Sequence, residues 1–170
     1  NPSTRHLATH TLGKIGGARA LDSLMRALHD VDPMVVSKAA FALGQIGDVQ
    51  AIPALVSVLG QEHREVQTSL ANVLEGFGAA AVQPLIGALQ HERWQVREHA
   101  ADILGQIGSR EAVPALIEAL NDEQWQVRFA IVTALGHIGG ARAKEAVQLM
   151  KDDPEERVRD LTPLVMKRMR

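Results

Sequence analysis

Two small groups of residues have the types and the spacing that chemistry could use. His6 and His10 lie four residues apart, which places both imidazoles on one face of a helix, where two nitrogens can hold a metal ion. Glu98 and Asp102 are also four apart, with His99 beside them, a combination able to exchange protons. Two imidazoles are few for a metal site, and we interpret both groups as polar residues on helix surfaces. The sequence therefore predicts no catalytic residue, no metal site and no cofactor.

The composition excludes further classes of function. There is no cysteine, so disulfides and thiolate nucleophiles are excluded, and 18 basic against 20 acidic residues form no nucleic-acid footprint. No apolar run approaches the ~20 residues of a membrane span. The chain begins with Asn rather than Met, and we expect it to be the C-terminal part of a longer, cytoplasmic protein.

A short phrase recurs along the chain at a nearly constant interval. Its copies read LGKIG (12–16), LGQIG (43–47 and 104–108), LGHIG (135–139) and a degenerate LEGFG (74–78). The first residues of successive copies are 31, 31, 30 and 31 residues apart. Repetition at this interval indicates a solenoid, in which each unit covers the apolar face of its neighbour.

Each repeat contains two helical patterns joined by a polar turn. In residues 110–120 the apolar residues fall on one helical stripe, 121–126 form the turn, and 127–139 make a second apolar helix that ends in glycine. We expect the first Gly of each phrase to permit close helix packing and the last Gly to end the helix.

These intervals define the expected boundaries of a single domain over residues 1–170. It consists of a half repeat at 1–16, repeats at 17–47, 48–78, 79–108 and 109–139, and a C-terminal capping repeat at 140–170. The cap is expected because Lys144, Gln148 and Lys151 stand where the previous repeat has apolar residues.

The segments 81–108 and 112–139 resemble the short HEAT-like repeats first noted in phycobilisome lyases. The resemblance implies a right-handed superhelix whose second helices line a concave face. Functions in that family include scaffolds, pigment lyases, chaperones and a di-iron hydroxylase, so fold alone does not decide the function. The hydroxylases carry repeated His-Glu pairs after the Val-Arg of the second helix. Here only Glu98-His99 has the right residue types, in reverse order, and we do not expect that activity.

Aspartate and arginine recur near the turns at fixed slots. The aspartate slot of the repeat holds Asp30, Asp122 and Asp153. A second slot, six residues further along each repeat, holds an arginine in three repeats, at Arg97, Arg128 and Arg159. Other residues replace them elsewhere: Gln61 and His91 for Asp, Val36 and Gln67 for Arg. We interpret the pattern as a structural ladder between neighbouring repeats.

The slots of the second helices that the core leaves free vary strongly between repeats and supply the candidate binding surface. Four of the five aromatic side chains occupy them, and Trp94 and Trp125 stand 31 residues apart, on successive repeats. Tryptophan is a frequent anchor at protein interfaces. The predicted partner-binding residues are Met34, Phe41, Gln45, Trp94, Gln95, Glu98, His99, Asp102, Gln106, Trp125, Gln126, Phe129, Thr133 and His137.

The sequence thus predicts an all-α fold, a right-handed α–α superhelix (HEAT-like solenoid) of about five and a half 31-residue helical-hairpin repeats. The predicted function is a non-enzymatic scaffold that binds a protein partner, with no nucleic acid and no membrane involved. The alternative is a bilin lyase or chaperone-like subunit that handles a phycobilin. The sequence leaves the oligomeric state open.

Overall fold

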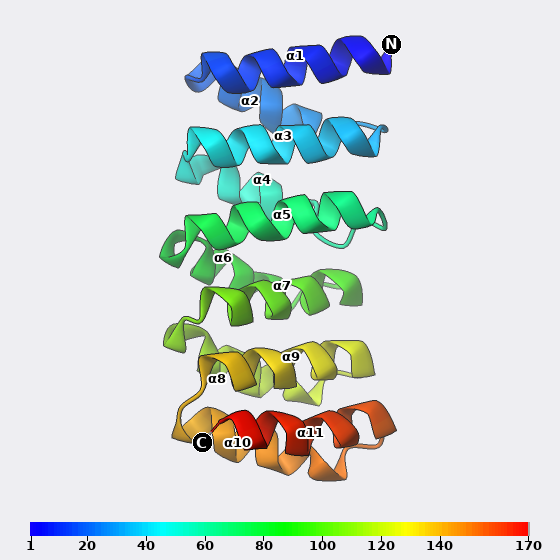
Figure 1. The fold of residues 1–170 in the computed structure, drawn as a ribbon, viewed down its shortest axis with the longest axis vertical. Helices are drawn as coiled ribbons and strands as arrows, with labels where there is room; N and C mark the ends of the chain where they lie inside the picture. Colours follow the sequence, from blue (N-terminus) through cyan, green and yellow to red (C-terminus); the bar gives the residue numbers. More distant parts are fainter. Residues whose placement is uncertain (170) are drawn as a thin grey trace. The chain divides into compact units, whose positions relative to one another are not determined.

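The computed structural model describes residues 1–169, and that part of the chain contains eleven α-helices and no strand, which confirms the predicted all-α class (Figure 1). The helices are α1 (Pro2–Ile15), α2 (Ala18–Ala27), α3 (Pro33–Ile46), α4 (Ile52–Ser57), α5 (Arg64–Phe77), α6 (Ala79–Ala88), α7 (Trp94–Ile107), α8 (Val113–Glu118), α9 (Trp125–Ile138), α10 (Ala141–Leu149) and α11 (Glu156–Arg168). Short 3₁₀ segments adjoin three of them, at Val49–Ala51, Arg110–Ala112, Ala119–Asn121 and Met150–Asp152.

The chain divides into two compact units, unit 1 (Asn1–Ala81) and unit 2 (Val82–Arg170). The division falls within α6. The repeat boundaries derived from the sequence stay a prediction, and each unit is described by itself.

In unit 1 the second helices of successive repeats, α1, α3 and α5, form one row (Figure 1). Helix α3 packs against both α1 and α5, and α2 fills the space between α1 and α3 from one side. Leu43 and Leu70, which face into this stack, are fully buried. The row exists because a single helical hairpin cannot cover its own apolar stripe.

Unit 2 repeats the arrangement with α7, α9 and α11, where α9 contacts both of its neighbours and the first helices α8 and α10 cover one side (Figure 1). Val127, Ile131 and Leu135 of α9 are completely buried, as their spacing predicts. Helix α9 starts at Trp125, two residues before the expected start of the apolar pattern. The same holds for Trp94 at the start of α7, so each tryptophan is the first residue of a second helix.

The recurring glycines have the two predicted roles. A Cβ on Gly105 would lie 2.7 Å from the Cα of Ala134, so this glycine permits the close approach of α7 and α9. Gly108 ends α7 with φ 71° and ψ 18°, the left-handed conformation that glycine adopts without strain. In the degenerate phrase, Glu75 occupies the close-approach slot, and a Cβ on Gly76 would meet nothing within 4 Å.

We therefore expect Gly105→Ala and Gly76→Ala to change stability in opposite directions. The added methyl at position 105 meets backbone atoms of α9, and such overpacking costs about 1–3 kcal/mol. At position 76 the methyl enters open space, and replacing a helical glycine with alanine adds roughly 0.5–1 kcal/mol. Urea unfolding of the three proteins measures both effects. Equal changes in the two variants would contradict the assigned roles.

Candidate interaction surface

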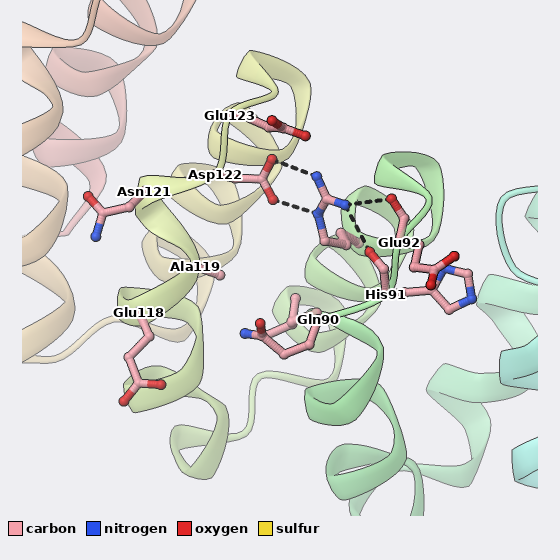
Figure 2. Close-up of a pocket in the computed structure, with 10 residues that line it drawn as sticks. Gln90, His91, Glu92, Glu118, Ala119, Asn121, Asp122 and Glu123 are labelled. Carbon is pink, nitrogen blue, oxygen red and sulfur yellow. Dashed lines mark hydrogen bonds and ion pairs between the residues drawn. The ribbon is translucent and has the colours of Figure 1, made fainter.

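In unit 2 an arginine ties the turn of its own repeat to the turn of the next. Arg97 on α7 donates to both carboxylate oxygens of Asp122, over 2.6 and 2.9 Å (Figure 2). It also donates to the main-chain carbonyls of His91 and Glu92, over 2.8 and 3.0 Å. Asp122 in turn accepts the N–H of Gln124 over 2.9 Å. Because Gln124 immediately precedes α9, one guanidinium group holds the turns in front of both α7 and α9.

The next repeat uses the same bonds in a more buried setting. Arg128 donates to Asp153 over 2.7 and 2.9 Å, and the two side chains are only 10% and 2% exposed. Arg128 also donates to the carbonyl of Asp122, and Asp153 accepts the N–H of Glu155 over 2.8 Å. The predicted Arg–Asp ladder between neighbouring repeats is therefore confirmed in unit 2.

Unit 1 contains a further arginine–aspartate pair, which the sequence pattern did not predict. Arg5 pairs with Asp30 over 2.7 and 2.9 Å. The signal was present, because Arg5 and Asp30 are separated by 25 residues, as are both pairs of unit 2. Where Gln67 replaces arginine, its amide donates to the carbonyl of Gln61 over 2.7 Å and keeps only the bond within the turn.

The ladder sets the charge state of its carboxylates. Burial raises the pKa of Asp122 and of Asp153, but the hydrogen bonds from Arg97 and Arg128 and from main-chain N–H groups outweigh it. The net pKa of both carboxyls lies below the ordinary aspartate value of 3.8. Both are therefore ionised at neutral pH and already paired, which makes them structural groups rather than acid–base catalysts.

A cavity of about 370 Å³ lies over this part of the ladder (Figure 2). Its walls include Arg97 and Asp122, which are bonded to each other, together with the carboxylates of Glu92, Glu118 and Glu123. Within the described residues no three His, Asp or Glu side chains are grouped so that they could hold a metal ion. No helix in this part of the chain is long and apolar enough to span a membrane. Besides Arg97 and its carboxylates, the polar residues that line the cavity are Gln90, His91 and Asn121.

The aromatic side chains of α9 form a cluster that a neighbouring helix covers in part. The ring of Phe129 meets that of Trp125 edge to face, with centroids 6.4 Å apart and planes at 90°. The guanidinium carbon of Arg157, on α11, lies 4.6 Å from the centre of the Trp125 ring. Trp94 and Trp125 are both half-buried, and Phe129 is 36% exposed. Trp125 thus packs on its own helix while part of its surface stays accessible.

Three ionisable groups beside this cluster have shifted pKa values. Burial of the carboxyl raises the pKa of Asp102 to about 6 and His137 partly offsets the effect, although the residue as a whole is exposed to solvent. Burial raises the pKa of Glu98 as well, and the Asp102 carboxylate adds to that shift. Burial lowers the pKa of His99. Neither carboxylate has an ion-pair partner among the described residues.

The other predicted residues of unit 2 lie on the same two helices. On α9 the side-chain oxygen of Gln126 is buried without a hydrogen-bond partner, whereas the hydroxyl of Thr133 donates to the carbonyl of Phe129 over 3.0 Å. The remaining members are half-buried or exposed: Gln95, His99, Gln106 and His137.

The predicted residues of unit 1 lie on α3. Met34 and Phe41 are 41% and 60% exposed, high values for large apolar side chains, and Gln45 is exposed. Phe41 and Gln45 line a cavity of about 610 Å³ together with Phe77 of α5, which the sequence analysis had counted only as a degenerate repeat position. The set predicted as one site is therefore distributed over both compact units.

Comparison with known proteins places this architecture in a family. The profile of HEAT repeats matches residues 1–75 and 82–162. The chain belongs to the HEAT-repeat family, and the resemblance seen in its sequence is confirmed. No curated protein matches the chain significantly.

Several solved structures share the fold. The chain is 25% identical to a chain of the CpcE–CpcF complex of phycocyanin lyase from Nostoc sp. PCC7120, with a TM-score of 0.61, and the match covers 91% of this chain and 66% of that one. Human deoxyhypusine hydroxylase in complex with glycerol is 24% identical over 97% of this chain and 78% of its own, with a TM-score of 0.57. A designed armadillo repeat protein in complex with the peptide (KR)4 is 17% identical, covers 97% and 91%, and has a TM-score of 0.55.

Removing one ladder carboxylate should strongly destabilise the protein. In Asp153→Asn the buried guanidinium of Arg128 loses its counter-charge, which typically costs about 3–5 kcal/mol. Asp152→Asn is the matched control, because that side chain is 81% exposed and such surface changes stay within about 0.5 kcal/mol.

The pH dependence of this effect follows from the lowered pKa of Asp153. The ion pair stabilises the fold above the unfolded-state pKa of 3.8, and that contribution is lost as the pH falls through the lower folded-state value. The unfolding free energies of wild type and Asp153→Asn should therefore differ at neutral pH and converge at strongly acidic pH. A pH-independent gap between them would contradict the assigned ion pair.

Replacing Asp102 should stabilise the protein, whereas replacing Asp153 destabilises it. The folded-state pKa of Asp102, about 6, lies above the ordinary aspartate value of 3.8, so the folded protein binds the extra proton between these values and stability falls as the pH rises through that window. Asp102→Asn should therefore raise the melting temperature at pH 7.5 and change it little at pH 4. Glu118→Gln, an exposed carboxylate on α8, serves as the control. Destabilisation of Asp102→Asn at pH 7.5 would disprove the raised pKa.

Proposed function

We propose that this chain is a non-enzymatic interaction module that binds a protein partner on the α7–α9 face. We use this name for the surface formed by Trp94, Gln95, Glu98, His99, Asp102 and Gln106 of α7 with Trp125, Gln126, Phe129, Thr133 and His137 of α9. The observation that carries the proposal is the cluster at Trp125, whose ring is fixed by Phe129 and Arg157 yet stays partly accessible.

An anchor residue binds well when its conformation is already fixed before the partner arrives. The edge-to-face contact with Phe129 and the guanidinium of Arg157 restrict the Trp125 ring, so less side-chain entropy is lost on binding. Half-buried aromatic side chains of this kind supply most of the binding energy in many interfaces.

The polar groups of the face favour one kind of contact. Burial raises the pKa of both Glu98 and Asp102, and the charge of Asp102 raises that of Glu98 further, so ionisation of these carboxyls is costly. A Lys or Arg side chain of the partner would relieve that cost. The preferred partner segment therefore presents a cationic side chain next to an apolar one.

Replacing both tryptophans with alanine tests the proposal. We expect the partner captured by the wild-type protein to be lost, since removing interface anchors costs at least ~2 kcal/mol, or about thirtyfold in affinity. The contacts of Trp125 with Phe129 and Arg157 are lost too, so we also expect a stability loss of about 1–2 kcal/mol. Pull-down with mass spectrometry and thermal melts measure the two effects separately.

Leu149→Ala provides the matched control in the same unit. Leu149 is 75% exposed on α10 and lies outside the α7–α9 face, so its loss should affect neither partner capture nor stability by much. Unchanged capture by a folded double tryptophan variant would refute the proposed face. Loss of capture in Leu149→Ala as well would show that the effect is not specific to it.

A second candidate, a bilin-handling lyase or chaperone subunit, rests on the 25% identity and the TM-score of 0.61 to the phycocyanin lyase chain. A bilin held by the purified protein would change the visible absorption spectrum of the pigment. Titration of the protein into a phycobilin solution, with spectra recorded at each step, discriminates between the two candidates. An unchanged spectrum would leave the interaction module as the function.

A further inference from the structure

Unit 2 contains a small apolar cavity at the start of α10, none of whose lining residues belongs to the α7–α9 face. We name it the α8–α10 cavity, and the apolar part of its lining consists of Val113 and Pro114 of α8 with Ala141 and Ala143 of α10. Its volume is about 290 Å³, just below the range of about 300–1,000 Å³ in which whole small-molecule ligands bind. The cavity therefore has room for roughly one side chain.

The charged residues that line this cavity are two arginines, and no Asp or Glu lines it within the described part of the chain. Arg110 and Arg142 are both exposed, and neither has an ion-pair partner among the described residues. The acidic residues nearest to them in the sequence, Glu111 and Glu145, lie outside the lining, and Glu111 accepts a hydrogen bond from Gln83 over 2.6 Å. A negatively charged group therefore complements the cavity.

The first turn of α10 supplies main-chain donors for such a group. The residue before the helix is Gly140, which has no side chain to cap it, and the first turn contains no acidic residue. The N–H groups of Ala141 and Arg142 have no acceptor among the described residues, whereas the N–H of Lys144 donates to the carbonyl of Gly140 over 3.0 Å. Free N–H groups and the helix dipole both favour an anion at this end.

Another repeat of the same chain shows which anion fits this position. The slot of Gly140 holds Asp48 in the repeat at 48–78, and the slot of Arg142 holds Gln50. The carboxylate of Asp48 accepts the N–H of Gln50 over 3.0 Å. Because Gly140 contributes no such carboxylate, the equivalent bond to the N–H of Arg142 has to come from another molecule.

We infer that the α8–α10 cavity binds the C-terminal residue of a partner protein, whose apolar side chain fills the cavity and whose free carboxylate accepts from the N–H of Arg142 and pairs with Arg110 and Arg142. The carboxylate and the apolar group must belong to one residue, since the cavity has room for roughly one side chain and both arginines line it. Neighbouring side chains of an extended segment point to opposite sides, so an internal acidic residue beside an apolar one does not meet this condition. A C-terminal residue carries both groups on one Cα, and main-chain N–H groups are a known means of capturing it.

The lining also distinguishes a peptide from a free amino acid with the same side chain. A free amino acid carries an α-ammonium group, which would lie beside two guanidinium groups with no carboxylate in the lining to pair with it. In a peptide this nitrogen belongs to an uncharged amide. The inference is independent of the α7–α9 face, because it uses other residues of unit 2.

Fluorescence anisotropy on the whole protein with labelled hexapeptides tests this inference. The peptides share an uncharged leader and end in Leu, Phe, Lys or Asp, each made with a free carboxylate and with a C-terminal amide. We expect the free acids ending in Leu or Phe to bind, and their amides and the peptides ending in Lys or Asp to bind at least tenfold more weakly. Arg142→Glu and Ala141→Phe should each weaken binding of the free acids at least tenfold, the first by repulsion and the second by filling the cavity.

Arg19→Glu is the matched control. Arg19 is exposed in the same sequence, Gly-Gly-Ala-Arg-Ala, at the start of α2, but the slots that correspond to Arg110 and Pro114 fall outside the sequence there. This variant, and the double tryptophan variant of the α7–α9 face, should bind the peptides as well as wild type, so failure of either surface is recognised separately. All these arginines and Ala141 are exposed, and thermal melts check that each variant folds.

Four results would each overturn the inference. The first is no binding of the free acids ending in Leu or Phe at ~1 mM protein. The second is equal binding of acids and amides, and the third is unchanged affinity in a folded Arg142→Glu variant. The fourth is competition by free leucine at the concentration at which the unlabelled peptide competes, which would make the cavity an amino-acid site.

Discussion

The arginine–aspartate pair between consecutive turns is the interaction on which the rest of the structure depends. Arg97 and Arg128 donate to the carbonyls of their own turns, and Asp122 and Asp153 each accept a main-chain N–H just before the next second helix. In unit 2 these bonds fix the main chain immediately before Trp94 and Trp125. The direction in which the side chains of Trp94 and Trp125 leave their helices is therefore set by buried ion pairs several residues away.

The repeat separates residues that build the stack from residues that can bind. Leucine, isoleucine and the close-approach glycines occupy slots that face neighbouring helices, as Leu104 and Gly105 do on α7. The slots between them face outward and vary between the copies. As a result the same scaffold presents aromatic and acidic side chains on α7 and α9, and a cavity lined by Phe41 and Phe77 between α3 and α5.

Features that depend on periodicity could be predicted from the sequence, and features that depend on individual contacts could not. The interval between phrases was sufficient to derive the number of helices, the buried positions and the ladder of Asp122 and Asp153. The pattern did not include Arg5, because the aspartate slot six residues before it falls outside the sequence. Its 25-residue spacing to Asp30 nevertheless matches the other pairs. The cation above Trp125 comes from Arg157, a residue in the next repeat whose side-chain direction no pattern specifies. Gly76 lies in the degenerate phrase, and no sequence pattern predicts the cavity that it lines between α3 and α5.

The ladder pairs also constrain how the protein reaches its folded state. Each pair joins residues 25 positions apart in the sequence. The side-chain hydrogen bond from Ser69 on α5 to the carbonyl of Ser37 on α3 joins residues 32 positions apart. Contacts this local close small loops, whose entropic cost is modest, and proteins with low contact order cross a low kinetic barrier. Folding can then nucleate at any pair of adjacent hairpins and spread outward, without waiting for the chain ends to meet. During synthesis the earliest repeats could acquire their structure while later ones are still being made.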